Sequence, residues 1–215
     1  MFKPRDVKTS SRHQRREALN LITMIKETRD GKIKGRACAD GRKQRRYISR
    51  DDVSSPTIQL ESLMITLLVD GYEHRDVATA DFVGAYLLAK MDDFILVKVD
   101  GTSADIMCRV NPAFNKFITK VRGKNTLYLQ LTKELYGCMQ SALLWYRTFK
   151  ECLEGLGFVM NPYDPCVANE MINDVQCTIC WYVDDTKISH VNSTVVDWVI
   201  HHIESKFGKN DGDQR

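Results

Sequence analysis

The chain has 215 residues, of which 43% are hydrophobic and 27% charged, and its net charge is +3. This length allows one domain of ordinary size with an arm or tail, and the composition excludes wholesale disorder, a collagen repeat and a small disulfide-bonded scaffold. No apolar run reaches the roughly 18 to 20 residues of a membrane helix, and the charged N-terminus is not followed by the apolar segment of a secretory signal. The seven cysteines are dispersed along the chain, which indicates reduced thiols. We therefore expect an intracellular protein in a reducing compartment.

The first 50 residues differ in charge from the rest of the chain. They hold 16 Lys and Arg against 5 Asp and Glu, a net charge of +11, whereas the remainder holds 15 against 23, a net charge of −8. Such a basic arm fits either contact with a polyanion or a solvated tail, and charge alone does not separate the two. Residues 1–17 are polar and lack periodicity, so we expect a disordered basic tail there.

A finger-like hairpin is predicted after this tail. Apolar residues over 18–25 indicate a short ordered element, Asp30-Gly31 is typical of a hairpin turn, and 33–39 is expected to be the second strand. A basic run over 42–46 follows the hairpin. A run of this kind is usually a solvated face.

The middle of the chain predicts one helix and two short strands. Ser55 and Pro56 are typical of a helix start, and apolar residues recur at helical spacing from Ile58 to Leu68. This pattern predicts a helix that ends near Gly71 and turns an apolar stripe toward the core. Strands are expected at 77–82 and 94–99.

The C-terminal half carries a second pattern of helices and strands. The expected elements are a helix over 141–156, strands over 166–170, 176–183 and 186–191, and a helix from Ser193 to Phe207. The order strand, helix, three strands, helix predicts an α+β fold. We expect a ferredoxin-like antiparallel sheet with helices on one face.

Two adjacent acids, Asp184 and Asp185, come directly after the apolar run 177–183. Ionised carboxylates at the end of a buried strand are costly unless they are paired or bind a cation, and Mg²⁺ prefers one or two carboxylates plus phosphates. Because successive strand residues point to opposite faces, we expect a tight turn here, and Asp184 as the ligand if only one acid binds directly. Turns also favour Asp for purely local reasons, so the pair alone is weak support for a metal site.

Asp81 provides another acid in a similar setting, within the apolar strand expected at 77–82. If the two strands are neighbours in the sheet, Asp81 and Asp184 lie close together. Carboxylates gathered in this way are what two-metal phosphoryl transfer needs.

Five sequence blocks together resemble the reverse transcriptase of Ty1/copia-type retrotransposons. The blocks are Lys32-Ile33-Lys34-Gly35-Arg36, Asp76-Val77-Ala78-Thr79-Ala80-Asp81-Phe82, Leu135-Tyr136-Gly137-Cys138-Met139-Gln140-Ser141, Tyr163-Asp164-Pro165-Cys166 and Tyr182-Val183-Asp184-Asp185. They follow the order and spacing of the family and cover roughly residues 20–208. The resemblance implies a right-hand polymerase with a palm and a fingers hairpin over 18–208, and RNA-directed DNA polymerase activity on a template-primer and dNTPs.

The resemblance also implies a role for each matching residue. Asp81, Asp184 and Asp185 match the catalytic aspartates, which bind two Mg²⁺ ions, for which Mn²⁺ can substitute. Four groups of residues match nucleotide contacts. Tyr86 matches the aromatic gate under the sugar, and Phe82 and Val83 match backbone positions near the triphosphate. The other matches are Tyr136 and Gly137 in the loop against the nucleotide, and Lys34 and Arg36 as cations of the fingers. Beside a polymerase, the basic residues Arg42, Lys43, Arg45 and Arg46 are expected to contact the phosphate backbone of nucleic acid.

The chain departs from the family pattern in two ways. Ala142 replaces a proline that is common after the Gln-Ser pair, and the chain ends at Arg215 without a thumb, a ribonuclease H domain, an integrase or a protease. These departures imply a fragment of a Pol polyprotein with a disordered tail over 209–215 and, as partners, other Pol-derived domains. The implied location is a cytoplasmic virus-like particle or the nucleus, without a membrane. The alternative function is an inactive retroelement relic that binds nucleic acid through its basic N-terminal region.

Two further features have both a structural and a functional interpretation. Cys177 and Cys180 have the spacing of half a zinc site, but the absence of a second Cys or His pair nearby favours ordinary thiols. Trp145, Tyr146 and Phe149 form either a stacking platform for bases or part of the core, and their place on an apolar helix favours the core.

Overall fold

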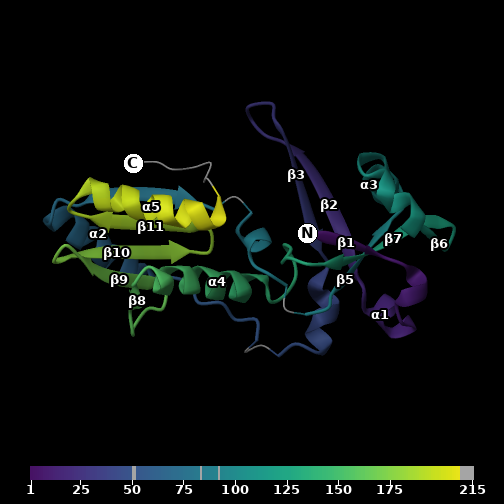
Figure 1. Cartoon of the computed structure of the whole chain (residues 1–215), viewed down its shortest axis with the longest axis horizontal. Coiled ribbons are helices and arrows are strands. Elements are labelled where there is room, and N and C mark those ends of the chain that lie inside the picture. Colours follow the sequence, from purple (N-terminus) through teal and green to yellow (C-terminus); the bar gives the residue numbers. More distant parts are fainter. Residues whose placement is uncertain (50–51, 83, 92, 209–215) are drawn as a thin grey trace. The chain divides into compact units, whose positions relative to one another are not determined.

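The computed structural model describes residues 1–49, 52–82, 84–91 and 93–208 (Figure 1). The chain divides into two compact units, which are described separately below. Unit 1 consists of Met1–Val53 and Ala89–Leu144, and unit 2 of Ser54–Leu88 and Trp145–Arg215. Both units combine helices and strands, in agreement with the predicted α+β class. The residues predicted as one domain, 18–208, are thus shared between two units.

Unit 1 is built around a sheet with the strand order β1-β7-β5-β2-β3, to which β6 is added beside β7. Its strands are β1 (Phe2–Arg5), β2 (Leu19–Glu27), β3 (Ile33–Ala39), β5 (Leu96–Asp100), β6 (Thr119–Val121) and β7 (Lys124–Leu131). Its helices are α1 (Arg12–Glu17) and α3 (Thr102–Val110), with the 3₁₀ helices η1 (Val7–Thr9), η2 (Gly41–Arg46) and η4 (Pro112–Phe117). Strand β2 pairs in parallel with β5 and antiparallel with β3.

The predicted hairpin of β2 and β3 is confirmed, with a longer first strand than expected. Its turn contains Gly31 at φ +77°, and the backbone N–H of Thr28 donates to the carbonyl of Lys32 at 2.8 Å. A positive φ of this kind is available to Gly at little cost. The turn therefore sets the register, which places Lys26 opposite Lys34.

Residues 2–17, expected to be a disordered tail, instead form β1, η1 and α1. Strand β1 pairs with β7, and Phe2 lies opposite Leu131. Helix α1 begins with a capping box in which Ser11 and Gln14 satisfy each other's backbone N–H groups. An edge strand is held by backbone hydrogen bonds to a distant partner, so it needs no apolar periodicity, and this is why the sequence pattern did not reveal it.

Unit 2 is built around an antiparallel sheet with the strand order β4-β11-β10-β9-β8. Its strands are β4 (Asp76–Asp81), β8 (Val159–Met160), β9 (Val167–Ile172), β10 (Val175–Tyr182) and β11 (Asp185–His190). Its helices are α2 (Leu60–Tyr72), the 3₁₀ helix η3 (Ala85–Leu88), α5 (Ser193–Phe207) and the part of α4 (Ser141–Gly155) that follows Leu144. The strands and helices predicted for this half are confirmed to within two residues at most ends.

One face of this sheet packs against α4 and α5, which run along it in Figure 1. Trp145, Phe149 and Phe82 form the aromatic centre of this core, with ring centroids 5.1 to 5.5 Å apart. Each of the three is at most 1% exposed. Trp145 and Phe149 are therefore core residues, as the sequence favoured, and are not accessible for stacking on bases.

Helix α2 contacts the other face of the sheet, which differs from the expected arrangement with helices on one face. Its polar residues point to the sheet: Asp70 pairs with Lys187 of β11, and Thr66 contacts the Cys180 thiol at 3.9 Å. Its apolar residues Leu60, Met64, Ile65, Leu67, Leu68 and Tyr72 are each at least 45% exposed. Most of the predicted core-facing stripe is therefore turned outward, because this face of the sheet offers polar partners. Two of its residues are exceptions: Leu63 is half-buried and lines a cavity beside the sheet, and Ile58, before the helix, packs against the core.

The start of α2 also differs from the prediction. The helix begins at Leu60, four residues after the Ser55-Pro56 pair. The backbone N–H of Gln59 donates to Oδ2 of Asp164 at 2.8 Å, so a carboxylate from a distant segment occupies the helix start. Among the described helices, none is long and apolar enough to span a membrane.

The seven cysteines are all free thiols, as predicted, and six of them are buried. Burial raises the pKa of Cys166 and Cys177 to about 12, which keeps both thiols protonated and unreactive at neutral pH. Cys177 belongs to the core on the α4 and α5 side, whereas Cys180 faces Thr66 of α2. The two thiols of this pair therefore point to opposite faces of β10.

Candidate active site

Asp81 and Asp185 lie directly opposite each other on paired strands of unit 2. Asp81 is the last residue of β4 and Asp185 is the first of β11, and the antiparallel register makes them partners. Side chains that are directly opposite in such a pair have Cβ atoms about 4.5 to 5.5 Å apart on one face of the sheet. Both carboxylates are exposed. The fold thus brings two of the three predicted catalytic aspartates together.

Asp184 lies in the predicted tight turn between β10 and β11. Tyr182 pairs with Asp185, so Val183 and Asp184 are the two residues of the turn. Val183 has φ +57°, a conformation that costs a β-branched residue free energy. Two hydrogen bonds hold the turn: the Trp145 indole Nε1–H donates to the Val183 carbonyl at 2.6 Å, and the Phe82 N–H donates to the Asp184 carbonyl at 3.1 Å.

The carboxylates suit a cation that binds together with phosphates. Among the described residues, no three His, Cys, Asp or Glu side chains are grouped into a metal cage. Mg²⁺ is usually held by one or two carboxylates, with water and substrate phosphates completing its shell. Asp81 and Asp185 supply two such carboxylates. The register places Asp185 opposite Asp81, whereas the sequence favoured Asp184 as the single direct ligand.

A cavity of about 370 Å³ opens beside these two carboxylates within unit 2. Asp81, Asp185 and Lys187 line it together with apolar residues that include Leu63. Lys187 was not singled out by the sequence pattern. The strand period of two, counted from Asp185, is the signal that places it on the same face.

The predicted nucleotide contacts of unit 2 have different surroundings. The ring of Phe82 is buried in the core, and its backbone N–H is already donated to Asp184. Tyr86 lies in η3, half-buried against the same core. Val83 falls outside the described residues. Part of the Tyr86 side chain is therefore exposed, whereas the Phe82 ring is not.

The predicted loop contacts Tyr136 and Gly137 belong to unit 1, where the loop packs against the end of β3. The backbone N–H of Ala39 donates to the Tyr136 carbonyl at 2.6 Å, and the Met139 N–H donates to Oε1 of buried Gln44 at 3.0 Å. Gly137 has φ +89°, and a Cβ atom there would lie 2.0 Å from the Ala39 carbonyl oxygen. Only glycine fits this position without moving the backbone.

The predicted cations Lys34 and Arg36 lie on the same face of β3, both exposed, in unit 1. They line a pocket of about 600 Å³ together with Lys26 and Arg29. Glu27 also lines this pocket. Lys26 and Arg29 were missed in the sequence, although the register of a hairpin turning at Asp30-Gly31 would have placed Lys26 opposite Lys34. The structure therefore adds two cations to the predicted pair.

The four residues of the basic run have different roles in the structure. The Lys43 ammonium donates to the carbonyls of Arg16 and Ala18 at 2.8 and 2.6 Å, so it holds the chain between α1 and β2. Arg42 pairs with Asp40 at 2.7 Å and lowers the pKa of that carboxyl to about 2. Arg45 and Arg46 are exposed. These two remain the better candidates for phosphate contacts.

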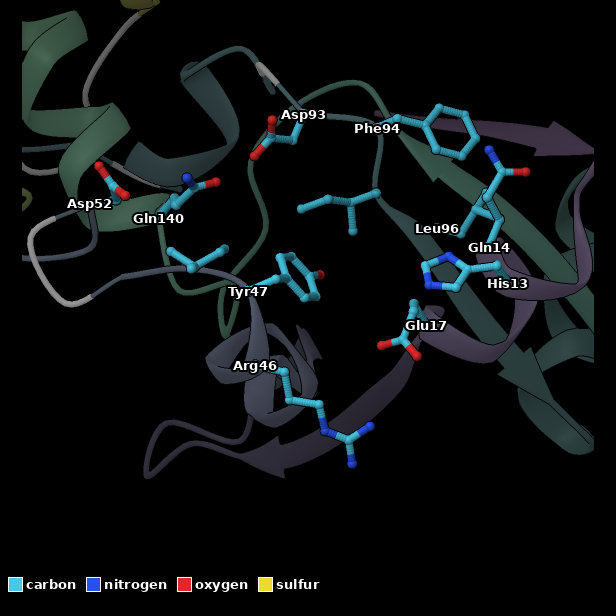
Figure 2. Close-up of a pocket in the computed structure, with 12 residues that line it drawn as sticks. His13, Gln14, Glu17, Arg46, Tyr47, Asp52, Asp93, Phe94, Leu96 and Gln140 are labelled. Carbon is cyan, nitrogen blue, oxygen red and sulfur yellow. The ribbon is translucent and has the colours of Figure 1, made fainter.

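Figure 2 shows a pocket of about 700 Å³ beside this run, within unit 1. The Tyr47 ring lies at its centre, and the Arg46 guanidinium points away from it. Glu17, Asp52 and Asp93 line the pocket, and burial, followed by the charge of Glu17, raises the Tyr47 pKa. Three carboxylates disfavour a phosphate, so this pocket does not extend the basic surface.

Comparison with known proteins agrees with the five sequence blocks. The model of the family described as reverse transcriptase (RNA-dependent DNA polymerase) matches residues 12–213. A retrovirus-related Pol polyprotein from transposon TNT 1-94 of Nicotiana tabacum is 24% identical over 171 residues, which cover 78% of this chain and 12% of that protein. The chain thus spans about an eighth of the length of this relative, and the resemblance to retrotransposon enzymes is confirmed. This chain belongs to the reverse transcriptase (RNA-dependent DNA polymerase) family.

Proposed function

We propose that the chain is the polymerising part of a Ty1/copia-type retrotransposon enzyme, with unit 2 as its palm and unit 1 as its fingers. The observation that carries this proposal is the cross-strand pair Asp81 and Asp185 next to a strained turn in a chain of the reverse transcriptase family. In the reaction, the 3′ hydroxyl oxygen of a primer releases its proton to water and forms a bond to the α-phosphorus of a dNTP. The bond from that phosphorus to the β-phosphate oxygen breaks, and pyrophosphate leaves.

The three aspartates are the groups that would hold divalent cations. Asp81 and Asp185 from the paired strands, with Asp184 from the turn, would bind two Mg²⁺ ions, or Mn²⁺ in their place. Bound cations of this kind stabilise the charge that develops on the attacking and leaving oxygens. The chain itself supplies the fixed positions of the carboxylates, through the sheet register and the two hydrogen bonds of the turn.

The cations of unit 1 would neutralise the triphosphate, which carries more negative charge than two metal ions cancel. Lys34 and Arg36 are exposed and share their pocket with Lys26 and Arg29. Tyr86 would stack under the sugar, and the loop of Tyr136 and Gly137 would pack against the base pair.

Arg45 and Arg46 would contact the backbone of the template-primer. Such contacts are electrostatic and sequence-independent, and they weaken steeply with salt. The proposed setting is a virus-like particle in the cytoplasm or the nucleus, together with other Pol-derived domains.

Extension of a primed RNA template by the purified chain in Mg²⁺ or Mn²⁺ tests the function. Asp185→Asn and Asp81→Asn should abolish extension, because each removes a charged ligand. Asp174→Asn is the matched control: Asp174 has φ +62° in the turn between β9 and β10, and Asn tolerates that conformation. Extension that survives in Asp185→Asn would contradict the proposal. A folded chain that binds nucleic acid in a salt-dependent way without extending primers would support the alternative of a non-catalytic binder.

A further inference from the structure

A buried ion pair lies on the same side of the sheet as the proposed metal ligands. Lys187 of β11 pairs with Asp70 of α2, and their side chains are 9% and 6% exposed. The second carboxylate oxygen of Asp70, Oδ1, is buried and has no hydrogen-bond partner among the described residues. A pair buried with incomplete hydrogen bonding is weak support for stability, because desolvation offsets much of the attraction. Its presence therefore calls for a role besides stability.

The position of Lys187 relative to the carboxylates suggests that role. Lys187 is two residues after Asp185 on β11, and its cross-strand partner is Thr79, two residues before Asp81. Residues i and i+2 of a strand share a face and are about 6.6 Å apart, and diagonal cross-strand neighbours lie within reach of a long side chain. The ammonium of Lys187 could therefore reach either carboxylate.

The cavity beside the carboxylates gives the lysine room to make this movement. Asp81, Asp185 and Lys187 all line the same space of about 370 Å³. Among the described residues that line it, Lys187 is the one with a positive charge. An ammonium turned into this cavity would form an ion pair with the very groups that bind the cation.

We infer that Asp70 is a positioning residue that holds the Lys187 ammonium away from Asp81 and Asp185, and so keeps both carboxylates free for a divalent cation. Because these carboxylates are metal ligands only under the function proposed above, the inference rests on that function. Without Asp70, Lys187 competes with the cation. Removing the lysine as well removes the competitor.

Direct binding of Mn²⁺ to the purified full chain, followed by the electron paramagnetic resonance signal of the free ion, tests this role without measuring activity. Asp70→Asn should weaken binding about fivefold, the factor that an ion pair of about 1 kcal/mol produces. The double variant Asp70→Asn/Lys187→Met should restore the wild-type affinity. Glu154→Gln, which breaks the exposed pair of Lys150 and Glu154 at 3.5 Å, is the control and should leave binding unchanged.

Two results would overturn the inference: unchanged binding in Asp70→Asn, or weak binding that persists when Lys187 is also removed. If Asp70→Asn does not fold, Asp70→Leu/Lys187→Met decides, because replacing both charges with apolar groups is usually tolerated. This variant should bind Mn²⁺ as tightly as the wild type, and weaker binding would show a purely structural role. Failure of the proposed function itself has a different signature: wild-type binding that Asp81→Asn and Asp185→Asn leave intact, or no binding by the wild type.

Discussion

The indole of Trp145 on α4 donates a hydrogen bond of 2.6 Å to the carbonyl of Val183, the residue that precedes the paired aspartates. Val183 is held at φ +57°, where a β-branched residue is strained by about 1 to 3 kcal/mol. A conformation of this kind persists only when its surroundings enforce it. The core helix α4 is therefore linked directly to the geometry of the turn that carries Asp184.

Trp145→Phe should lower primer extension by loosening this turn, because it removes the hydrogen bond while keeping an aromatic ring in the core. The cost in unfolding free energy should be about 1 kcal/mol for the lost bond. Val183→Gly should restore much of the activity of Trp145→Phe, since glycine adopts a positive φ without strain. The rate of single-nucleotide addition across this double-mutant cycle measures the coupling.

Phe149→Leu provides the control for lost packing alone. Phe149 is fully buried beside Trp145, and its ring makes no hydrogen bond to the turn. Val183→Gly should not rescue it. Equal rescue of both variants would show that Trp145 acts through packing and that its indole N–H does not position the turn.

Gly137→Ala should destabilise unit 1 by about 2 to 3 kcal/mol, because a methyl group would meet the Ala39 carbonyl and the residue would keep a positive φ. Gly123→Ala is matched in φ, at +78°, but has no atom within 4 Å of the added carbon. Gly123→Ala should lower the unfolding free energy by only about 1 kcal/mol, because an alanine is strained at this positive φ. Urea denaturation of the two variants measures the difference, and equal losses would show that the close approach to Ala39 relaxes.

The Asp40 carboxyl should titrate with a pKa of about 2, well below its ordinary value of 3.8, because the Arg42 guanidinium stabilises its charged form. A lowered folded-state pKa stabilises the fold above the unfolded pKa, and this contribution is lost as the pH falls through about 4 toward 2. In Arg42→Gln the pKa should return toward 3.8, as read from the carboxyl carbon shift by nuclear magnetic resonance. A pKa that stays near 2 would assign the shift to the backbone instead.

The elements predicted well from the sequence are those specified by neighbouring residues. Asp30-Gly31 predicts its hairpin, and Asn173 and Asp174, both at positive φ, form the turn between the strands expected at 166–170 and 176–183. Asp184 and Asp185 were recognised because ionised carboxylates at the end of a buried strand are costly unless they are paired or bind a cation. These signals are local, so they can be recognised before the fold is known.

The elements that were missed depend on distant partners. Strand β1 is held by β7, more than 120 residues later, and the importance of Lys187 depends on Asp70 of α2. Helical periodicity located α2, but it could not show that Thr66 and Asp70 face the sheet while most of the apolar stripe is exposed. Periodicity identifies the two faces of a helix, and the partner decides which one is buried.

Leu68→Ala on α2 tests this inverted orientation. Leu68 is 73% exposed, so truncation should change the unfolding free energy by less than about 0.5 kcal/mol. Leu153→Ala on α4 is the matched control: Leu153 is fully buried, and its truncation should cost about 2 to 5 kcal/mol. Thermal and urea denaturation of both variants give the comparison. A large loss in Leu68→Ala would mean that the apolar stripe of α2 is buried in solution, and the polar contacts of Thr66 and Asp70 with the sheet would then need to be reassigned.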